Sequence, residues 1–91
     1  MAKVLVIDDS PLLRTVLCDY LRDLGHEPVP AGTAREALRL CREQRPDLAI
    51  KDLLMEGLDP HLFLDDLRRI IPDLPVVICS TIARRQEICA A

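Results

Sequence analysis

The sequence has no tryptophan, a single tyrosine, a single phenylalanine and only three glycines. It therefore lacks the aromatic side chains on which single-stranded nucleic acids stack, and its net charge of -3 gives no general attraction to phosphate backbones. Gly25, Gly32 and Gly57 are too widely spaced to form a phosphate-cradling loop, which argues against a Gly-rich nucleotide site. We expect no direct contact with nucleic acid.

Long apolar runs are also missing. The first run, residues 4–7, stops at two acids, so it is neither a signal-peptide core nor a membrane span. Cys18, Cys41, Cys79 and Cys89 show no C-x-x-C pairing and no histidine at ligand spacing, which predicts buried, reduced thiols. We expect one cytoplasmic domain with no membrane segment, because 91 residues leave room for a single core.

Short β-branched runs alternate with stretches of helical spacing. This order is typical of repeated βαβ units around a parallel sheet. Helix starts are marked by Ser10 before Pro11, by Thr33 with Glu36 as a capping box, and by Asp59 before Pro60. Strands are expected near residues 3–8, 27–31, 48–52 and 76–79, and helices near 11–24, 34–45, 60–71 and 82–89.

Apolar spacing predicts which faces of two helices are buried. On the first helix the expected face comprises Leu12, Leu13, Val16, Leu17, Tyr20, Leu21 and Leu24, with Gly25 as the stop. On the third helix it comprises Leu62, Phe63, Leu67, Ile70 and Ile71.

Two strands have unusual compositions. Pro28 and Pro30 share one parity, so their missing N–H groups can both point to solvent, which predicts an outermost position for the second strand. The third strand has a central composition but includes Lys51, whose side chain is expected to point toward a sheet face.

Polar side chains follow three of the predicted strands. Asp8 and Asp9 end the first strand, Asp52 ends the third, and Ser80 and Thr81 follow the fourth. Neighbouring parallel strands lie roughly 4.8 Å apart, so the acids can share one hard cation such as Mg²⁺, which takes oxygen ligands. The pattern predicts a phosphate-handling site at the carboxyl ends of the strands, where open α/β sheets bind ligands.

With these residues assembled, the sequence resembles the receiver domain of bacterial two-component response regulators across residues 1–91. The motif residues are Val-Ile-Asp-Asp-Ser at 6–10, Pro-Asp-Leu at 46–48, Asp-Leu-Leu-Met at 52–55 and Leu-Pro-Val-Val at 74–77 leading to Ser80. The resemblance implies a flavodoxin-like doubly wound parallel sheet of strand order 2-1-3-4, with (βα)4 present of an expected (βα)5.

The resemblance also implies residue roles. Asp52 would accept a phosphoryl group from a sensor histidine kinase or a phosphotransfer protein, and Ser80 and Thr81 would lie beside that group. Asp8, Asp9, Asp52 and the backbone carbonyl of Leu54 would hold Mg²⁺. The implied protein is a phosphoacceptor that switches a partner-binding surface, not an enzyme.

The sequence departs from the family pattern in several places. Glu56 stands where proline is usual, Pro60 where glycine is usual, and Thr81 where alanine is usual. The chain stops within the fourth predicted helix, without the fifth strand, its lysine, the aromatic switch residue and the last helix. Neither Lys3 nor Lys51 is placed to replace that lysine. We expect a C-terminally truncated chain, missing residues, or a homodimer that exchanges a strand.

Two other functions stay open at this point. A docking or dimerisation module that keeps the acids without being phosphorylated is favoured by the missing lysine and aromatic residue. A phosphatase with an aspartyl nucleophile would need a second acid two residues after Asp52, where the sequence has Leu54.

Overall fold

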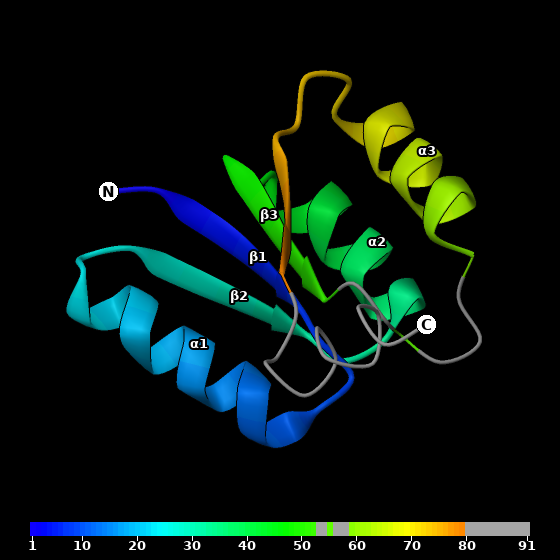
Figure 1. Cartoon of the computed structure of the whole chain (residues 1–91). Helices are drawn as coiled ribbons and strands as arrows, with labels where there is room; N and C mark the ends of the chain where they lie inside the picture. Colours follow the sequence, from blue (N-terminus) through cyan, green and yellow to red (C-terminus); the bar gives the residue numbers. More distant parts are fainter. Residues whose placement is uncertain (53–54, 56–58, 80–91) are drawn as a thin grey trace.

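The computed structural model describes residues 1–52, 55 and 59–79, and within them strands and helices alternate (Figure 1). Four parallel strands lie in the order β2-β1-β3-β4. This is the predicted flavodoxin-like, doubly wound arrangement. The elements are β1 (Lys3–Ile7), α1 (Pro11–Asp23), β2 (Glu27–Ala31), α2 (Ala34–Gln44), β3 (Leu48–Asp52), α3 (Pro60–Ile70) and β4 (Val76–Cys79).

Helices cover both faces of the sheet. Helix α1 lies on one face, and α2 and α3 lie on the other (Figure 1). The core is correspondingly split into two apolar clusters. The α2/α3 side contains Leu5, Ile7, Val29, Ala31, Ala37, Cys41, Ala49, Phe63, Leu67 and Leu74, and the α1 side contains Val4, Val6, Cys18 and Leu21.

Strand β2 is an outer strand, as its prolines predicted. The N–H of Glu27 donates to the carbonyl of Ala2, and the carbonyl of Ala31 accepts from the N–H of Asp8. Residues of this parity therefore face β1. Pro28 and Pro30 have the other parity, so neither proline removes a hydrogen bond from the β1–β2 ladder.

The predicted helix starts are confirmed. The Ser10 hydroxyl accepts from the N–H of Leu13 at 3.4 Å, and the Thr33 hydroxyl accepts from the N–H of Glu36 at 3.1 Å. The Asp59 carboxylate accepts from the second and third residues of α3. These side chains fix the strand-to-helix turns by accepting from N–H groups that have no partner within the helix.

The buried face of α1 was predicted wrongly in part. Leu12, Val16, Tyr20 and Leu24 are between 54% and 72% exposed, whereas Cys18 and Leu21 are buried against the sheet. The helix has two apolar stripes spaced by four residues, and only the one near Cys18 packs inward. Leu62 on α3 is also exposed, while Phe63 and Leu67 are buried as predicted.

Cys18 and Cys41 are buried free thiols, as the sequence predicted, whereas the free thiol of Cys79 is only half-buried. Cys89 lies outside the described residues. Within the part of the chain that the structure describes, no helix combines the length and the apolar character needed to cross a membrane.

Candidate phosphoacceptor and metal site

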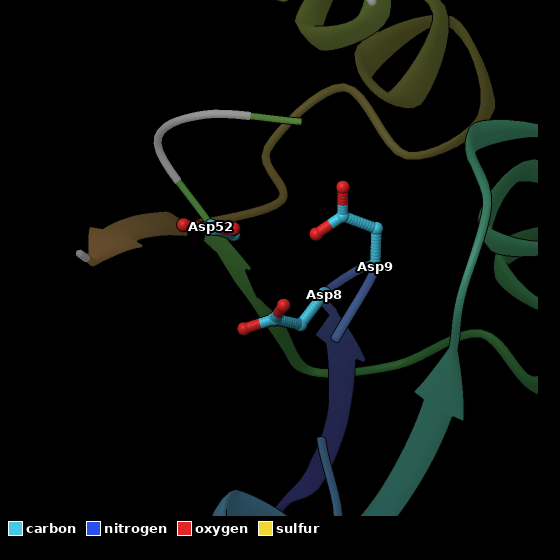
Figure 2. Close-up of side chains that lie close together, drawn as sticks. All are labelled: Asp8, Asp9 and Asp52. Atoms are coloured by element: carbon cyan, nitrogen blue, oxygen red, sulfur yellow. The ribbon is translucent and has the colours of Figure 1, made fainter. Parts of the chain in front are cut away.

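Three acidic side chains meet where β1 and β3 end. These strands are neighbours in the sheet, with Ile7 paired to Lys51 in register. Asp8 and Asp9 follow β1 directly, and Asp52 is the last residue of β3 (Figure 2). One carboxylate oxygen from each acid lies within 4.8 Å of the other two. The sheet thus brings Asp52 together with two acids that lie more than 40 positions earlier in the sequence.

Asp8 is held firmly by its surroundings. Its N–H continues the sheet ladder by donating to the carbonyl of Ala31 at 3.1 Å, and its carboxylate accepts from the N–H of Ser10 at 2.9 Å. The guanidinium of Arg14 donates to its main-chain carbonyl at 2.8 Å. Asp8 is only 3% exposed. This carboxylate therefore has little freedom to move away from the cluster.

Asp9 and Asp52 differ from each other in exposure. Asp52 is 2% exposed, whereas Asp9 is exposed to solvent. Figure 2 shows Asp8 and Asp9 rising from the end of β1 toward the end of β3, where Asp52 lies. The cluster therefore has a buried floor and a side open to solvent.

The donor set fits a hard divalent cation. Mg²⁺ prefers carboxylate oxygens and keeps several of its waters, so one oxygen from each of two or three acids is a suitable partial ligand set. The spacing of up to 4.8 Å between the oxygens is compatible with ligands around one ion. Asp8, Asp9 and Asp52 are the residues of the described chain that would hold it.

Lys51 precedes Asp52 on β3 and is 1% exposed. Its ammonium donates to the main-chain carbonyl of Asp52 at 2.7 Å and lies 5.9 Å from the centre of the Phe63 ring on α3. Burial lowers the pKa of Lys51, and the carboxylate of Asp52 opposes that shift. The side chain points to a sheet face, as predicted, and the contact with Phe63 shows that this is the face covered by α3.

Cys79 at the end of β4 is the register partner of Asp52. Burial raises the pKa of its thiol, and the carboxylates of Asp52 and Asp8 raise it further. This thiol is therefore a weak nucleophile in its protonated form.

The sequence predictions for the site have different outcomes. Asp8, Asp9 and Asp52 are brought together, whereas Leu54, Ser80 and Thr81 lie outside the described residues. The contact of Arg14 with the carbonyl of Asp8 was not predicted. Its only sequence signal is a basic residue in the first turn after an acidic strand end, which is also common on solvated helix faces.

Comparison with known proteins gives a consistent result. The model of the response regulator receiver domain family matches residues 4–91. The transcriptional regulatory protein AfsQ1 of Streptomyces coelicolor is 34% identical over 88 residues, covering 97% of this chain and 38% of AfsQ1. The response regulator protein FleR of Pseudomonas aeruginosa is 39% identical over 79 residues, covering 87% of this chain and 17% of FleR.

The chain thus spans less than half the length of these two relatives. Among solved structures, the chemotaxis protein CheY4 of Vibrio cholerae superimposes with a TM-score of 0.80 at 30% identity, covering 99% of this chain and 79% of CheY4. A response regulator receiver domain protein from Clostridium thermocellum gives 0.81 at 29% identity, covering 99% and 74%. From its matched residues, its sheet order and these relatives, the chain belongs to the response regulator receiver domain family.

Proposed function

We propose that this chain is the phosphoacceptor receiver of a two-component phosphorelay, with Asp52 as the residue that becomes phosphorylated. The observation that carries the proposal is the convergence of Asp8, Asp9 and Asp52 within 4.8 Å at the carboxyl ends of two neighbouring strands. Membership of the receiver family supports it. The phosphodonor would be a sensor histidine kinase or a phosphotransfer protein, met in the cytoplasm.

In the proposed step, a carboxylate oxygen of Asp52 attacks the phosphorus of the donor's phosphohistidine. An O–P bond forms, the N–P bond breaks, and the electron pair of that bond returns to the imidazole nitrogen. Mg²⁺, when bound, neutralises charge on the transferring phosphoryl oxygens. The chain therefore accepts a group once from each donor and is not proposed to turn over a substrate as an enzyme.

The protein's contribution to this step is to hold the carboxylates in place. Asp52 is fixed at the end of a strand with neighbours on both sides, and Asp8 is fixed by its contacts with Ser10 and Arg14. Such preorganisation avoids reorientation when charge develops. Ser80 and Thr81 are proposed, from their motif position, to contact the phosphoryl oxygens, and the Leu54 carbonyl to be a further metal ligand.

Helix α1 is the surface that we propose for the phosphodonor. It begins at Pro11, two residues after Asp9, so a protein that delivers a phosphoryl group to Asp52 must approach its first turns. Leu12 is 72% exposed and Val16 is 54% exposed there. An apolar helical surface of the donor fits this stripe. Replacing both residues with serine should slow transfer from a phosphorylated kinase that acts on the wild-type chain, and leave phosphorylation by a small donor unchanged.

The function is tested by incubating the chain with phosphoramidate, with and without Mg²⁺, and measuring the intact mass. We expect the addition of one phosphoryl group only with Mg²⁺, and its loss in Asp52→Asn. Asp47→Asn is the matched control, because Asp47 precedes the same strand at its opposite end and is exposed. No mass increase in the wild-type chain would reject the phosphoacceptor function and leave the docking or dimerisation module.

A further inference from the structure

A buried lysine next to a cluster of acids is the feature of this structure that packing explains least. Lys51 is 1% exposed, and its ammonium lies near Phe63, which belongs to the apolar cluster on the α2/α3 side of the sheet. Burying an ammonium is costly unless polar partners compensate, whereas an unbranched apolar residue such as methionine could fill the same space. A lysine at this position therefore suggests a role for its charge.

The contacts of the Lys51 ammonium hold that charge in one place. It donates to the carbonyl of Asp52 at 2.7 Å, and the Phe63 ring lies 5.9 Å away, within the range of a cation–π contact. One partner is the main chain of Asp52 itself, and the other belongs to α3. Lys51 thus links the end of β3 to a helix on the covered side of the sheet.

The charge of Lys51 interacts electrostatically with the carboxylate of Asp52 in the acid cluster. Lysine ordinarily has a pKa of 10.5, and although burial lowers this value, the nearby Asp52 carboxylate favours the ammonium form. The hydrogen bond to the Asp52 carbonyl and the contact with the Phe63 ring are those that a charged ammonium makes. Asp8 and Asp52 are 3% and 2% exposed, and charges on buried groups interact more strongly than charges at the surface. The positive charge of Lys51 therefore opposes the binding of Mg²⁺ to these carboxylates. It also favours a change that makes the site more negative, such as the addition of a phosphoryl group.

We propose that Lys51 is an electrostatic positioning residue, whose fixed positive charge next to Asp52 weakens resting Mg²⁺ binding and stabilises the more negative, phosphorylated form of the site. This inference rests on the proposed function of Asp52. Phosphorylation replaces one carboxylate charge with a phosphoryl group that carries up to two negative charges. A neutral residue at position 51 would therefore shift Mg²⁺ affinity and phosphorylation in opposite directions.

The central test is Lys51→Met, which keeps the unbranched stem and removes the charge. Mg²⁺ affinity is measured from shifts of main-chain amide signals during an NMR titration, and the phosphorylated fraction by intact mass after incubation with phosphoramidate at saturating Mg²⁺. We expect Mg²⁺ to bind about tenfold more tightly and the phosphorylated fraction to fall about threefold, as one unit charge at this range implies.

Three further variants separate charge from packing. Lys3→Met is the same change on β1 at the amino end of the sheet, and it should leave both measurements within about twofold of wild type, because that lysine is exposed to screening solvent. Lys51→Arg keeps the charge and should retain a Mg²⁺ affinity near that of wild type. Leu67→Ala weakens the α3 core without removing a charge, so it should not produce opposite changes in the two measurements.

Each outcome decides the proposal. Weaker or unchanged Mg²⁺ binding in Lys51→Met would overturn it, since loss of structure lowers affinity and loss of a like charge raises it. If Lys51→Met does not fold, Lys51→Gln gives the same neutralisation, and the same two results decide. If the wild-type chain binds Mg²⁺ but is not phosphorylated, the proposed function fails, while the sign of the Mg²⁺ change still tests the electrostatic effect.

Discussion

At the amino ends of the strands, Lys3 contacts the acids Asp47 and Glu27. At the carboxyl ends, Asp8, Asp9 and Asp52 lie close together, next to the buried Lys51. Lys3 and Asp47 exchange two hydrogen bonds of 2.8 Å, one to the Asp47 carboxylate and one between main chains. The Lys3 ammonium also lies 3.7 Å from the Glu27 carboxylate. At the other end, Asp8, Asp9 and Asp52 lie within 4.8 Å of one another.

This difference in charge arrangement indicates which end of the sheet holds the candidate site. Exposed ion pairs such as Lys3–Glu27 contribute about 0 to 1 kcal/mol to the free energy of unfolding. In such a pair the two charges compensate each other within the protein. Carboxylates placed this close repel one another, and a bound cation relieves that repulsion. The charged groups at the amino end thus form surface ion pairs, and the carboxyl end holds the carboxylates on which the proposed Mg²⁺ and phosphoacceptor site depends.

The largest effect that separates the two ends is expected for Mg²⁺ binding. Asp8→Asn keeps an oxygen that can accept from Ser10 but removes a charge from the cluster, so Mg²⁺ affinity should fall by at least about tenfold. Glu27→Gln at the amino end should leave the affinity unchanged. An NMR titration of both variants measures this. Equal affinities in the two variants would contradict the proposed metal site.

The glycines at the two ends of β2 should both resist substitution, for different reasons. A Cβ at Gly32 would lie 2.8 Å from the guanidinium of Arg14, which would have to leave the carbonyl of Asp8. Gly25 has a φ of +87° and open space around it, so alanine there is strained by the backbone alone. We expect each change to alanine to cost about 1 kcal/mol of unfolding free energy.

A double-mutant cycle in urea distinguishes these two causes. In an Arg14→Ala background, Gly32→Ala should lose most of its cost, because the clashing group and its hydrogen bond are already gone. Gly25→Ala should cost the same with or without Arg14. Additive effects for Gly32 and Arg14 would show that the cost of Gly32→Ala does not arise from a clash with the guanidinium.

The buried thiols should make the free energy of unfolding depend on pH in the alkaline range. This effect is expected to be smaller than those of the glycine substitutions. Burial raises the pKa of Cys41 and of Cys18. Above about pH 8.5 the unfolded chain releases these protons while the folded chain keeps them, so the free energy of unfolding falls as pH rises. Lys51 acts oppositely, because its lowered pKa leaves the folded chain with fewer bound protons than the unfolded one.

The contribution of the Cys41 thiol can be isolated by comparing how the free energy of unfolding changes with pH in two proteins. Cys41→Ala should show a shallower loss of stability than wild type between about pH 8.5 and about pH 10, measured by urea unfolding at each pH. The Lys51 contribution is common to both proteins and cancels in the comparison. Parallel curves would mean that the Cys41 thiol titrates alike in the folded and unfolded chains.

The smallest effect is expected at the amino end. Lys3→Met removes the exposed contact with Glu27 and should change the unfolding free energy by less than about 0.5 kcal/mol. High salt should change the wild-type stability through this pair by no more than that amount. Urea unfolding at low and high salt measures both. A loss well above this range would show that the amino-end charges matter more than surface pairs usually do.

Much of the fold was predictable because its signals are local. Ser10, Thr33 and Asp59 begin the three described helices, since a hydroxyl or carboxylate at a cap accepts from N–H groups only two or three residues away. The prolines of β2 identified an outer strand for the equally local reason that they cannot donate to a ladder. The acids that follow β1 and end β3 indicated the site because parallel strands end at the same edge of a sheet.

Other parts of the site could not be predicted, because they depend on how side chains are oriented once the strands and helices have packed. Nothing near Arg14 indicates that it contacts the carbonyl of Asp8, and the charge of Lys51 was recognisable only as an anomaly in a central strand. Its contact with Phe63 depends on how α3 packs over the sheet. Which apolar stripe of α1 faces inward was likewise undecided by spacing, since both stripes repeat every four residues.

By itself, the sequence determined the order of the described strands and helices, the starts of α1, α2 and α3, the outer position of β2 and the location of the acids at strand ends. Short-range sterics and hydrogen bonds encode all of these. The tertiary structure alone decided the 4.8 Å spacing of the three carboxylates, the burial of Lys51 next to them and the exposure of Leu12, Val16, Tyr20 and Leu24 on α1. These features arise only when strands and helices distant in the chain pack together and choose which side chains lose contact with water.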